Sequence, residues 1–352
     1  MNNRKRNRCA ISTSLLPVLG ALAITCASNG QILVDHNAPG PTHNGETWAT
    51  AFLDPQDAID DAVAGDVIHV AEGTYSGTII VSGSSKNGIR IFGGFAGFGA
   101  NDPDFRDILG GNTILDGGDT TRVVTFTNVA ALDEEPARLD GFVIRNGFVQ
   151  SQGTPGAGIS IDDSSVLIAN CRIEQNAAGD GPNGISGPGG GAFVTGFRPA
   201  AESERTVYFI NCAFRDNTAT RGGGLNVEGV LTSGEDAFRT KVQLVNCLFE
   251  SNVVSFSGND PTVVEGRGGA MMVRGNASVQ AFNCTIADNA ADAIAGGIAA
   301  VCPGSGSEAE PGVIVRNSIL WGNTISPSTA AQLGVIQELG TCQPFTVEWS
   351  NV

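Results

Sequence analysis

A seven-residue pattern of alternating apolar and polar positions recurs five times in the second half of the chain. Each copy pairs an Asn with a Cys or Ser, places an apolar residue two positions after that Cys or Ser, and ends on a second Asn. The copies start at Asn170, Asn211, Asn246, Asn283 and Asn317, 34 to 41 residues apart. Because apolar residues that alternate with a period of two mark strands rather than helices, each copy predicts one strand of a repeating unit.

A glycine-led apolar strand precedes each copy. These strands cover residues 158–161, 191–194, 224–227, 269–272 and 297–300. Two kinds of strand that recur together, with loops of variable length between them, are typical of a solenoid in which each repeat contacts only its neighbours. The pattern therefore predicts a single all-β solenoid.

The alternation also predicts which side chains face the interior. Counting from the Cys or Ser, we expect three inward positions in each repeat, occupied by Ala169, Ile210, Val245, Phe282 and Val315, by the Cys or Ser itself, and by Ile173, Phe214, Phe249, Ile286 and Leu320. On the glycine-led strands we expect the outward positions to be Ser160, Phe193, Asn226, Met271 and Ala299, followed by Asp162, Thr195, Glu228, Val273 and Val301.

Further strand-length apolar segments precede the repeats. We predict strands at 67–70, 78–81, 89–92, 113–115, 122–126 and 139–144, and a short amphipathic helix over 55–64 that covers the first turn. Residues 31–65 then form an entry segment with a cap helix, and residues 66–352 form a solenoid of roughly eight to nine turns. A last strand at 344–352 has no cap after it in the sequence. Either a partner covers this edge or the chain is truncated, and the edge suits end-to-end pairing with another chain.

The N-terminus has the layout of an export signal. Four basic residues within the first eight positions are followed by an apolar run at 15–24 and by small residues, which predicts a signal peptide over residues 1–30. The run is about half of the ~20 residues that a membrane-spanning helix needs. A retained N-terminal anchor and a lipid anchor on Cys26 are the alternatives. We expect no transmembrane segment after cleavage.

Composition narrows the choice of partners. Glycine is frequent, at 48 residues, and charged residues make up 16% of the chain, against ~25% in average globular proteins. The formal net charge is −16, and without the four N-terminal cations 16 basic and 36 acidic residues remain. Because nucleic-acid binders neutralise phosphates with Lys and Arg, we expect no nucleic-acid partner, and no binding to an anionic membrane surface.

Several motifs resemble those of known β-helix proteins. The Gly-Gly-Ala segment 190–192 followed by Phe-Arg-Asp-Asn at 214–217 resembles the repeats of polymorphic outer-membrane proteins, as do 268–270 and 286–289. The opening stretch 32–75 is similar to the start of secreted bacterial β-helix proteins, and 317–323 with 347–352 is similar to the C-terminal region of choice-of-anchor surface proteins. The resemblance implies a right-handed parallel β-helix, or pectin-lyase-like, fold over residues 31–352. Enzymes of that fold act in a groove over one sheet.

Cysteines and asparagines recur at fixed places in the repeats. Cys171, Cys212, Cys247 and Cys284 share one register, where parallel Cα–Cβ bonds are poorly aimed for disulfides. We therefore expect a reduced, stacked ladder, with bridging as the alternative, and no metal site, because a linear stack does not converge tetrahedrally. Cys302 and Cys342 lie outside this register and are the pair we consider for a disulfide. A second structural ladder is expected from stacked amides at Asn176, Asn217, Asn252, Asn289 and Asn323.

Two carboxylates are the candidate catalytic residues. Asp162 and Glu228 are the only acidic side chains at the expected outward positions, two turns and about 9.6 Å apart. That separation is near the upper limit for an inverting glycosidase. The alternative is that both are solvated carboxylates at strand ends. The sequence lacks the clustered aspartates of polygalacturonase-like sites and the calcium cluster of pectate-lyase-like sites.

Other chemistry is sparse. His36, His43 and His69 lie in the entry segment and the first strand and suggest neither a metal site nor a catalytic triad. The acidic loops 102–104 and 133–135 are candidates for weak Ca²⁺ binding, and no other cofactor is expected.

Two functions follow. The first is a secreted or surface-attached, non-catalytic protein that binds glycans or proteins along its flank. The alternative is a polysaccharide lyase or glycoside hydrolase acting on uronic-acid-containing polymers. The missing catalytic clusters favour the first function.

Overall fold

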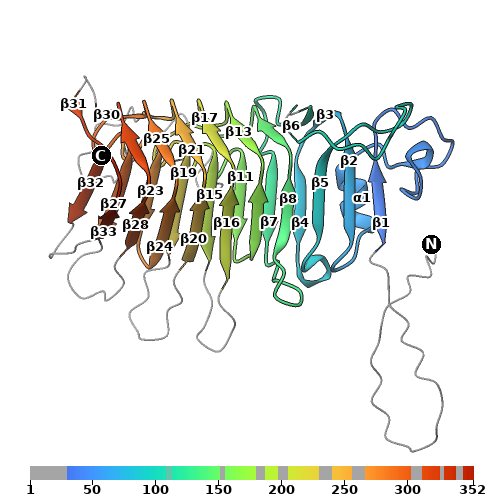
Figure 1. Ribbon diagram of the computed structural model, residues 1–352, viewed down its shortest axis with the longest axis horizontal. Coiled ribbons are helices and arrows are strands. Elements are labelled where there is room, and N and C mark those ends of the chain that lie inside the picture. Colours follow the sequence, from blue (N-terminus) through green and yellow to red (C-terminus); the bar gives the residue numbers. More distant parts are fainter. Residues whose placement is uncertain are drawn as a thin grey trace, which may run out of the picture.

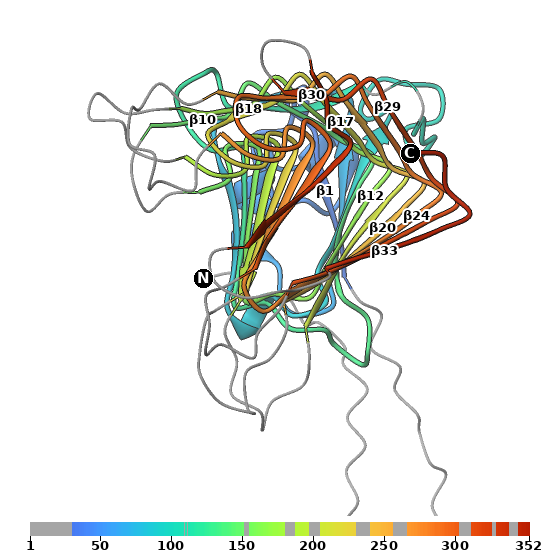
Figure 2. The same ribbon diagram turned by 90° about the vertical axis from the view of Figure 1, so that its left-hand side faces the viewer.

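A computed structural model describes residues 30–108, 110, 112–150, 155–179, 187–196, 205–229, 240–255, 266–302, 311–325, 329–337 and 344–352. Over these ranges the chain winds into a right-handed parallel β-helix, as the sequence predicts, with the N-terminal turns at one end and β33 at the other (Figure 1). Viewed along its axis, the strands of successive turns lie one behind another (Figure 2). The helix predicted to span a membrane is absent from this part of the chain: no described helix is long and apolar enough to do so.

Each repeat contributes one strand to each of four sheets. The long sheet has ten parallel strands: β1 (Gln31–Val34), β2 (Val67–Ala71), β5 (Arg90–Phe95), β8 (Ala137–Asp140), β12 (Val166–Ala169), β16 (Thr206–Ile210), β20 (Thr240–Val245), β24 (Ala277–Phe282), β28 (Gly312–Arg316) and β33 (Phe345–Glu348). The glycine-led sheet has eight: β4 (Ile79–Ser82), β7 (Val124–Thr127), β11 (Ile159–Asp162), β15 (Ala192–Gly196), β19 (Leu225–Gly229), β23 (Met271–Arg274), β27 (Ile298–Cys302) and β32 (Leu333–Gln337).

The two remaining sheets complete each turn. The charged sheet consists of β3 (Gly73–Ser76), β6 (Thr113–Asp116), β9 (Val143–Arg145), β13 (Arg172–Glu174), β17 (Ala213–Arg215), β21 (Leu248–Glu250), β25 (Thr285–Ala287) and β29 (Ile319–Trp321). The minor sheet has shorter strands: β10 (Phe148–Val149), β14 (Ala177–Ala178), β18 (Thr218–Ala219), β22 (Val253–Val254), β26 (Ala290–Ala291), β30 (Thr324–Ile325) and the antiparallel β31 (Thr329–Ala330).

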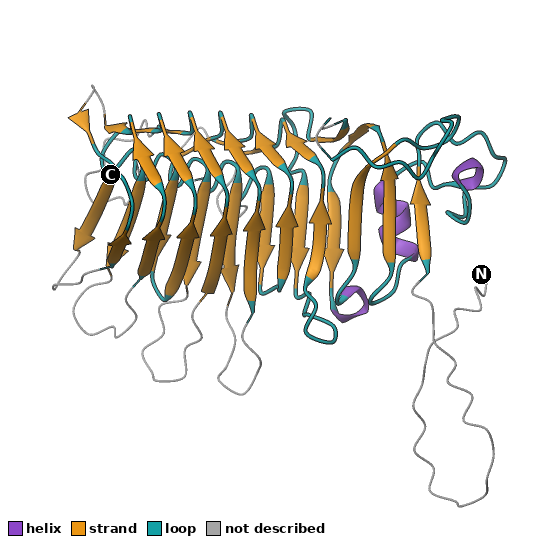
Figure 3. Cartoon of the chain, viewed as in Figure 1, coloured by secondary structure: helices purple, strands orange, loops and turns teal. Residues whose placement is uncertain are grey.

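A short helix lies at the N-terminal end (Figure 3). Helix α1 (Pro55–Asp61) starts where the Asp54 side chain accepts a hydrogen bond from the amide of Gln56, and it ends at Ala62, whose backbone is extended. The 3-10 turns η1 (Trp48–Thr50) and η2 (Ser84–Lys86) flank it in sequence. Ala58 and Ile59 are fully buried in the main core. The predicted helix over 55–64 is therefore present but three residues shorter.

The predicted inward set needs one correction. The residue before each Cys or Ser takes a left-handed conformation, with φ between 49° and 55° at Asn170, Asn211, Asn246, Asn283 and Asn317. This corner interrupts the alternation, so the residue three places before the Cys faces inward: Ile168, Phe209, Leu244 and Ala281 are 0% exposed. Ala169, Ile210, Val245 and Phe282 instead face outward on the long sheet, whereas Val315, three places before Ser318, is inward as expected.

A second correction concerns β23. Met271 pairs in register with Leu225 and Val273 with Val227, so both point into the core, and Met272 and Arg274 take the outward positions. Ala270, not Gly269, is the equivalent of Gly191 and Gly224. Glycine suits this position because a Cβ on Gly191 would lie 2.5 Å from the carbonyl oxygen of Gly224.

The segment 139–144, predicted as one strand, is two. Strands β8 and β9 are separated by Gly141, with φ at 82°, at the same corner that Asn170 occupies one turn later. On the outer face of the charged sheet the register then aligns side chains of alternating charge, Asp116, Arg145, Glu174, Arg215 and Glu250. Arg145 Nε lies 2.8 Å from Asp116 Oδ2, and Arg215 Nε lies 2.9 Å from Glu250 Oε2.

Candidate functional site

The structure places both candidate catalytic carboxylates in one column of the glycine-led sheet. Asp162 pairs in register with Thr195, and Thr195 pairs with Glu228, so the two acids are two turns apart, as predicted. Their environments differ, and that difference decides what each can do.

Glu228 is engaged by its neighbours. Its Oε1 lies 3.4 Å from Arg221 Nη2 and accepts a hydrogen bond from Asn226 Nδ2 at 3.1 Å. The side chains of Glu228 and Arg221 are only 24% and 13% exposed. A carboxylate held in this way between a guanidinium and an amide suits a structural role better than that of a general base.

Asp162 is exposed and lies beside a second carboxylate. Partial burial raises its pKa above the ordinary value, the adjacent Asp163 raises it further, and Arg205 opposes both effects. Arg205 Nη1 lies 3.7 Å from Asp163 Oδ1. Asp162 therefore has one property of a general acid, a pKa displaced towards neutrality, but Glu228 does not supply its partner.

The outward column next to these acids is covered. Ser160, Phe193, Asn226, Met272 and Ala299 are all at most 8% exposed. The backbone arch that leads into each strand lies against them: a Cβ on Gly189 would lie 3.0 Å from Phe193 Cβ, and one on Gly222 would lie 2.9 Å from Asn226 Cβ. At this column the glycine-led sheet offers no open groove among the described residues.

The four ladder cysteines are free thiols at most 2% exposed. Each thiol lies within hydrogen-bonding distance of a backbone carbonyl; Cys171 Sγ, for example, lies 3.1 Å from the Ala169 oxygen and Cys247 Sγ lies 3.3 Å from the Phe209 oxygen. Burial raises the pKa of Cys171 to about 12. Such thiols pack as small apolar groups and are poor nucleophiles.

The five ladder asparagines are at most 1% exposed and are hydrogen-bonded from turn to turn. In each step the Nδ2 group donates to Oδ1 of the Asn on the next turn, at 2.8–3.0 Å. The same Oδ1 also accepts from the preceding Asn's peptide N–H. These side chains hold the corner between the charged and minor sheets.

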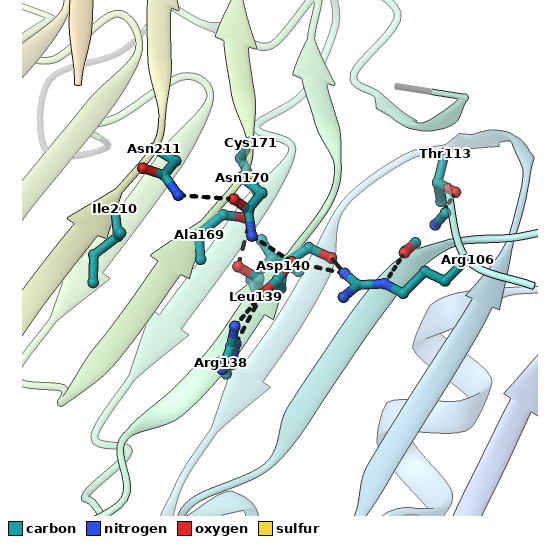
Figure 4. Close-up of polar contacts among 12 residues, drawn as sticks. Arg106, Thr113, Arg138, Leu139, Asp140, Ala169, Asn170, Cys171, Ile210 and Asn211 are labelled. Atoms are coloured by element: carbon teal, nitrogen blue, oxygen red, sulfur yellow. Dashed lines mark hydrogen bonds and ion pairs between the residues drawn. The ribbon is translucent and has the colours of Figure 1, made fainter. Parts of the chain in front are cut away.

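A buried ion cluster anchors the opposite corner (Figure 4). The Asp140 side chain is 0% exposed; its Oδ1 accepts from Arg106 Nη2 at 2.7 Å and from Asn170 Nδ2 at 3.1 Å, and its Oδ2 accepts from Arg138. Burial alone would raise the pKa of Asp140, but hydrogen bonds from Asn170, Arg106 and Arg138 outweigh it and lower the pKa. With every acceptor site filled, this carboxylate is structural.

The remaining candidates form no site in the described part of the chain. Cys342 and the side chain of Cys302 lie outside the described residues, as do residues 1–29 of the predicted signal peptide. His69 is stacked on Phe95 with ring centroids 4.1 Å apart, and burial lowers its pKa to about 4. In the described ranges, no three His, Cys, Asp or Glu side chains gather to hold a metal ion, the loops 102–104 and 133–135 included.

An open groove lies instead on the outer face of the long sheet. Its floor is formed by outward side chains of β12 and β16, chiefly Leu167, Tyr208 and Ile210, and one wall is the turn that carries Glu134 and Pro136. Ser165, Arg205, Thr206, Ala130 and Ala131 complete the lining, and the volume is about 540 Å³. This is within the ~300–1,000 Å³ range of small-molecule sites. We call it the long-sheet groove.

The groove begins where the N-terminal cover of the long sheet ends. Over β2 and β5 the outer face is packed under the entry segment and the loop that follows β5, where Trp48 Nε1 donates to Asp104 Oδ1 at 2.9 Å and Trp48 contacts Phe95. At one end of the groove Arg205 joins the lining to Asp163, next to Asp162. The structure therefore places the Asp162 corner beside the groove and leaves Glu228 two turns away.

Sequence reasoning missed this groove. Ile210 was expected in the core, and Tyr208 was not assigned a role, because the left-handed corner at Asn211 was not recognised. Tyr208 is an aromatic side chain on the outward side of a strand, at a column where later turns carry Gln243 and Gln280. That column is the signal from which the groove was predictable.

The fold is shared with enzymes that process pectin. The pectin methylesterase PemA from Erwinia chrysanthemi is 9% identical, with a TM-score of 0.40 over 93% of this chain and 90% of that one. Pectate lyase Pel9A is 14% identical, with a TM-score of 0.40 over 92% and 79%. The pectin methylesterase from Aspergillus niger is 15% identical, with a TM-score of 0.37 over 93% and 91%. No protein-family model matches the chain, and no curated protein matches it.

Proposed function

We propose that this is an exported protein that binds polysaccharide in the long-sheet groove and along the outer face of the sheet beyond it. The observation that carries the proposal is the groove itself, with the Tyr208 ring on its floor and polar groups around its rim. Tyrosine combines a flat apolar ring with a polar hydroxyl, which suits the C–H faces and hydroxyls of a sugar. Export follows from the basic and apolar N-terminal segment of the sequence.

The outer face continues the groove over three further turns. Gln243, Gln280 and Ile314 follow Tyr208 in register on β20, β24 and β28, about 4.8 Å apart. Val245 and Phe282 follow Ile210 in the neighbouring column and are partly exposed. A surface that repeats similar side chains at a fixed spacing suits a ligand that is itself a repeating chain.

The test is binding by the variant Tyr208→Ala against a panel of polysaccharides on an array and by calorimetry. Loss of the ring should weaken binding at least tenfold, or about 1.4 kcal/mol. Tyr208→Phe should retain most of the affinity, because it keeps the ring. Thr218→Ala, an exposed substitution on the minor sheet, is the matched control. If Tyr208→Ala binds as well as the unaltered protein, the groove is not the binding site.

Cleavage of the bound polymer is the second candidate, and Asp162 favours it. The raised pKa of Asp162 and its place beside the groove suit proton donation to a leaving group. Asp162→Asn should then abolish any cleavage while leaving binding intact, and cleavage that persists in this variant would exclude Asp162 as the acid.

A further inference from the structure

We infer that the polymer bound by the long-sheet groove is uncharged, so that the site discriminates against uronic-acid polymers. This inference rests on the proposed function. It starts from the outward positions of β12, β16, β20, β24 and β28. Only Lys241 and Arg316 among them carry charge; the others are Ser165, Leu167, Ala169, Thr206, Tyr208, Ile210, Gln243, Val245, Ser278, Gln280, Phe282, Gly312 and Ile314.

The cations near this surface already have partners. Arg205 lies 3.7 Å from Asp163, and Arg316 Nε lies 2.9 Å from Glu348 Oε2. Lys241 also has an interaction partner of its own. Recognition of a carboxylate requires an available cation, preferably an arginine that can form two parallel hydrogen bonds.

The wall of the groove is acidic. Glu134 lines it, and Asp133 and Glu135 are exposed on the same turn. The protein as a whole carries a formal charge of −16. A polyuronate entering this groove would bring its carboxylates towards Glu134 with no counter-charge, so like-charge repulsion would oppose binding.

The uncharged side chains, by contrast, match the chemistry of a neutral sugar. Gln243 and Gln280 each offer two N–H donors and a carbonyl acceptor, which suit hydroxyl groups. Ile210, Val245 and Phe282 form an apolar column beside them, suited to the C–H faces of sugar rings. Binding of this kind depends little on ionic strength, because no charge pair is formed.

The experiment compares neutral hexasaccharides of glucose, mannose, xylose and galactose with hexagalacturonate, by calorimetry at low and at moderate salt. We expect at least one neutral series to bind, with a Kd that changes less than twofold with salt, and hexagalacturonate to bind at least tenfold more weakly. The double variant Gln243→Ala/Gln280→Ala should weaken binding of the neutral hexasaccharide about tenfold, with Thr218→Ala as the matched control. Glu134→Lys should raise the affinity for hexagalacturonate.

The possible failures are distinguishable. Stronger, salt-sensitive binding of hexagalacturonate that Tyr208→Ala abolishes would overturn the inference and leave the proposed function standing. Absence of binding to every hexasaccharide and polymer, or binding that Tyr208→Ala leaves unchanged, would overturn the proposed function itself.

Discussion

The buried asparagine ladder gives the sharpest test of what holds successive turns together. Asn252 lies in the middle of the ladder and is 0% exposed. Its Nδ2 donates to the Phe214 carbonyl and to Asn289 Oδ1, both at 2.9 Å. Its Oδ1 accepts from the peptide N–H and from the Nδ2 of Asn217, at 3.2 and 2.9 Å. Asn252→Ala therefore removes four hydrogen bonds that connect three turns.

The expected loss follows from these contacts. At about 1 kcal/mol for each hydrogen bond, the variant should lose about 4 kcal/mol of unfolding free energy. The Asn217 peptide N–H is left buried without this acceptor, which is among the more destabilising outcomes. Urea unfolding followed by circular dichroism measures the free energy, and hydrogen exchange at the Asn217 amide locates the damage, which should appear there first.

Asn246→Gly is the matched control. Asn246 lies on the same turn, is exposed, and makes one side-chain hydrogen bond, to Asn211 at 3.3 Å. Glycine accepts the left-handed conformation at that corner, so the variant should lose less than about 1 kcal/mol. If Asn252→Ala is no less stable than Asn246→Gly, the buried ladder does not stabilise the solenoid in the way argued here.

Four further predictions follow from other contacts. Asp140→Asn should lose about 3 kcal/mol at neutral pH, because two arginines lose their charged partner; since the folded pKa of Asp140 is lowered, its contribution should persist above pH ~4 and disappear as the pH falls further, and a variant equally stable at pH 7 would contradict this. The pKa of His69 falls to about 4 from its ordinary 6.5, so stability should decline by about 1–2 kcal/mol, allowing for its partial exposure, as the pH drops from 6.5 to 4; His69→Gln should flatten that decline in acid titrations of urea unfolding. Native Cys247 should resist a thiol reagent and react once the protein unfolds, and rapid native labelling would show that the ladder opens. Amides of β33, which pairs only with β28 in the described residues, should exchange faster in a dilute monomer than those of β20, which has strands on both sides; protection of β33 that rises with protein concentration would indicate end-to-end pairing, and equal protection in a monomer would contradict the prediction.

The coiled fold was predictable because each turn repeats the same polar markers. The Asn-Cys pair and the second Asn recur at fixed spacing, and both sit at corners whose geometry only a few residues accept. The direction of the side chains near those corners was less predictable. A residue in the left-handed region reverses the expected alternation, and nothing in the apolar pattern marks where that happens, so Ile210 and Phe282 were assigned to the wrong face.

The binding groove was harder to predict for a different reason. Its floor comes from β12 and β16, but its wall comes from the turn around Glu134, which lies some seventy residues earlier than Tyr208. Only the coil-to-coil register brings these segments together. Asp162 and Glu228 were placed in the correct column, yet the arginine and amide beside Glu228 come from separate parts of the repeat, which strand periodicity does not reveal.

The alternating charges on the charged sheet limit how this protein can change in length. The cysteine and asparagine ladders are the same on every turn, so by themselves they would allow any turn to be lost or duplicated. The column from Asp116 to Glu250 is not the same on every turn. Deleting the turn that carries Arg215 would bring Glu174 beside Glu250, whereas deleting two adjacent turns, those of Glu174 and Arg215, would bring Arg145 beside Glu250 and keep opposite charges together. In this part of the solenoid, evolutionary gain or loss of turns should therefore occur in pairs.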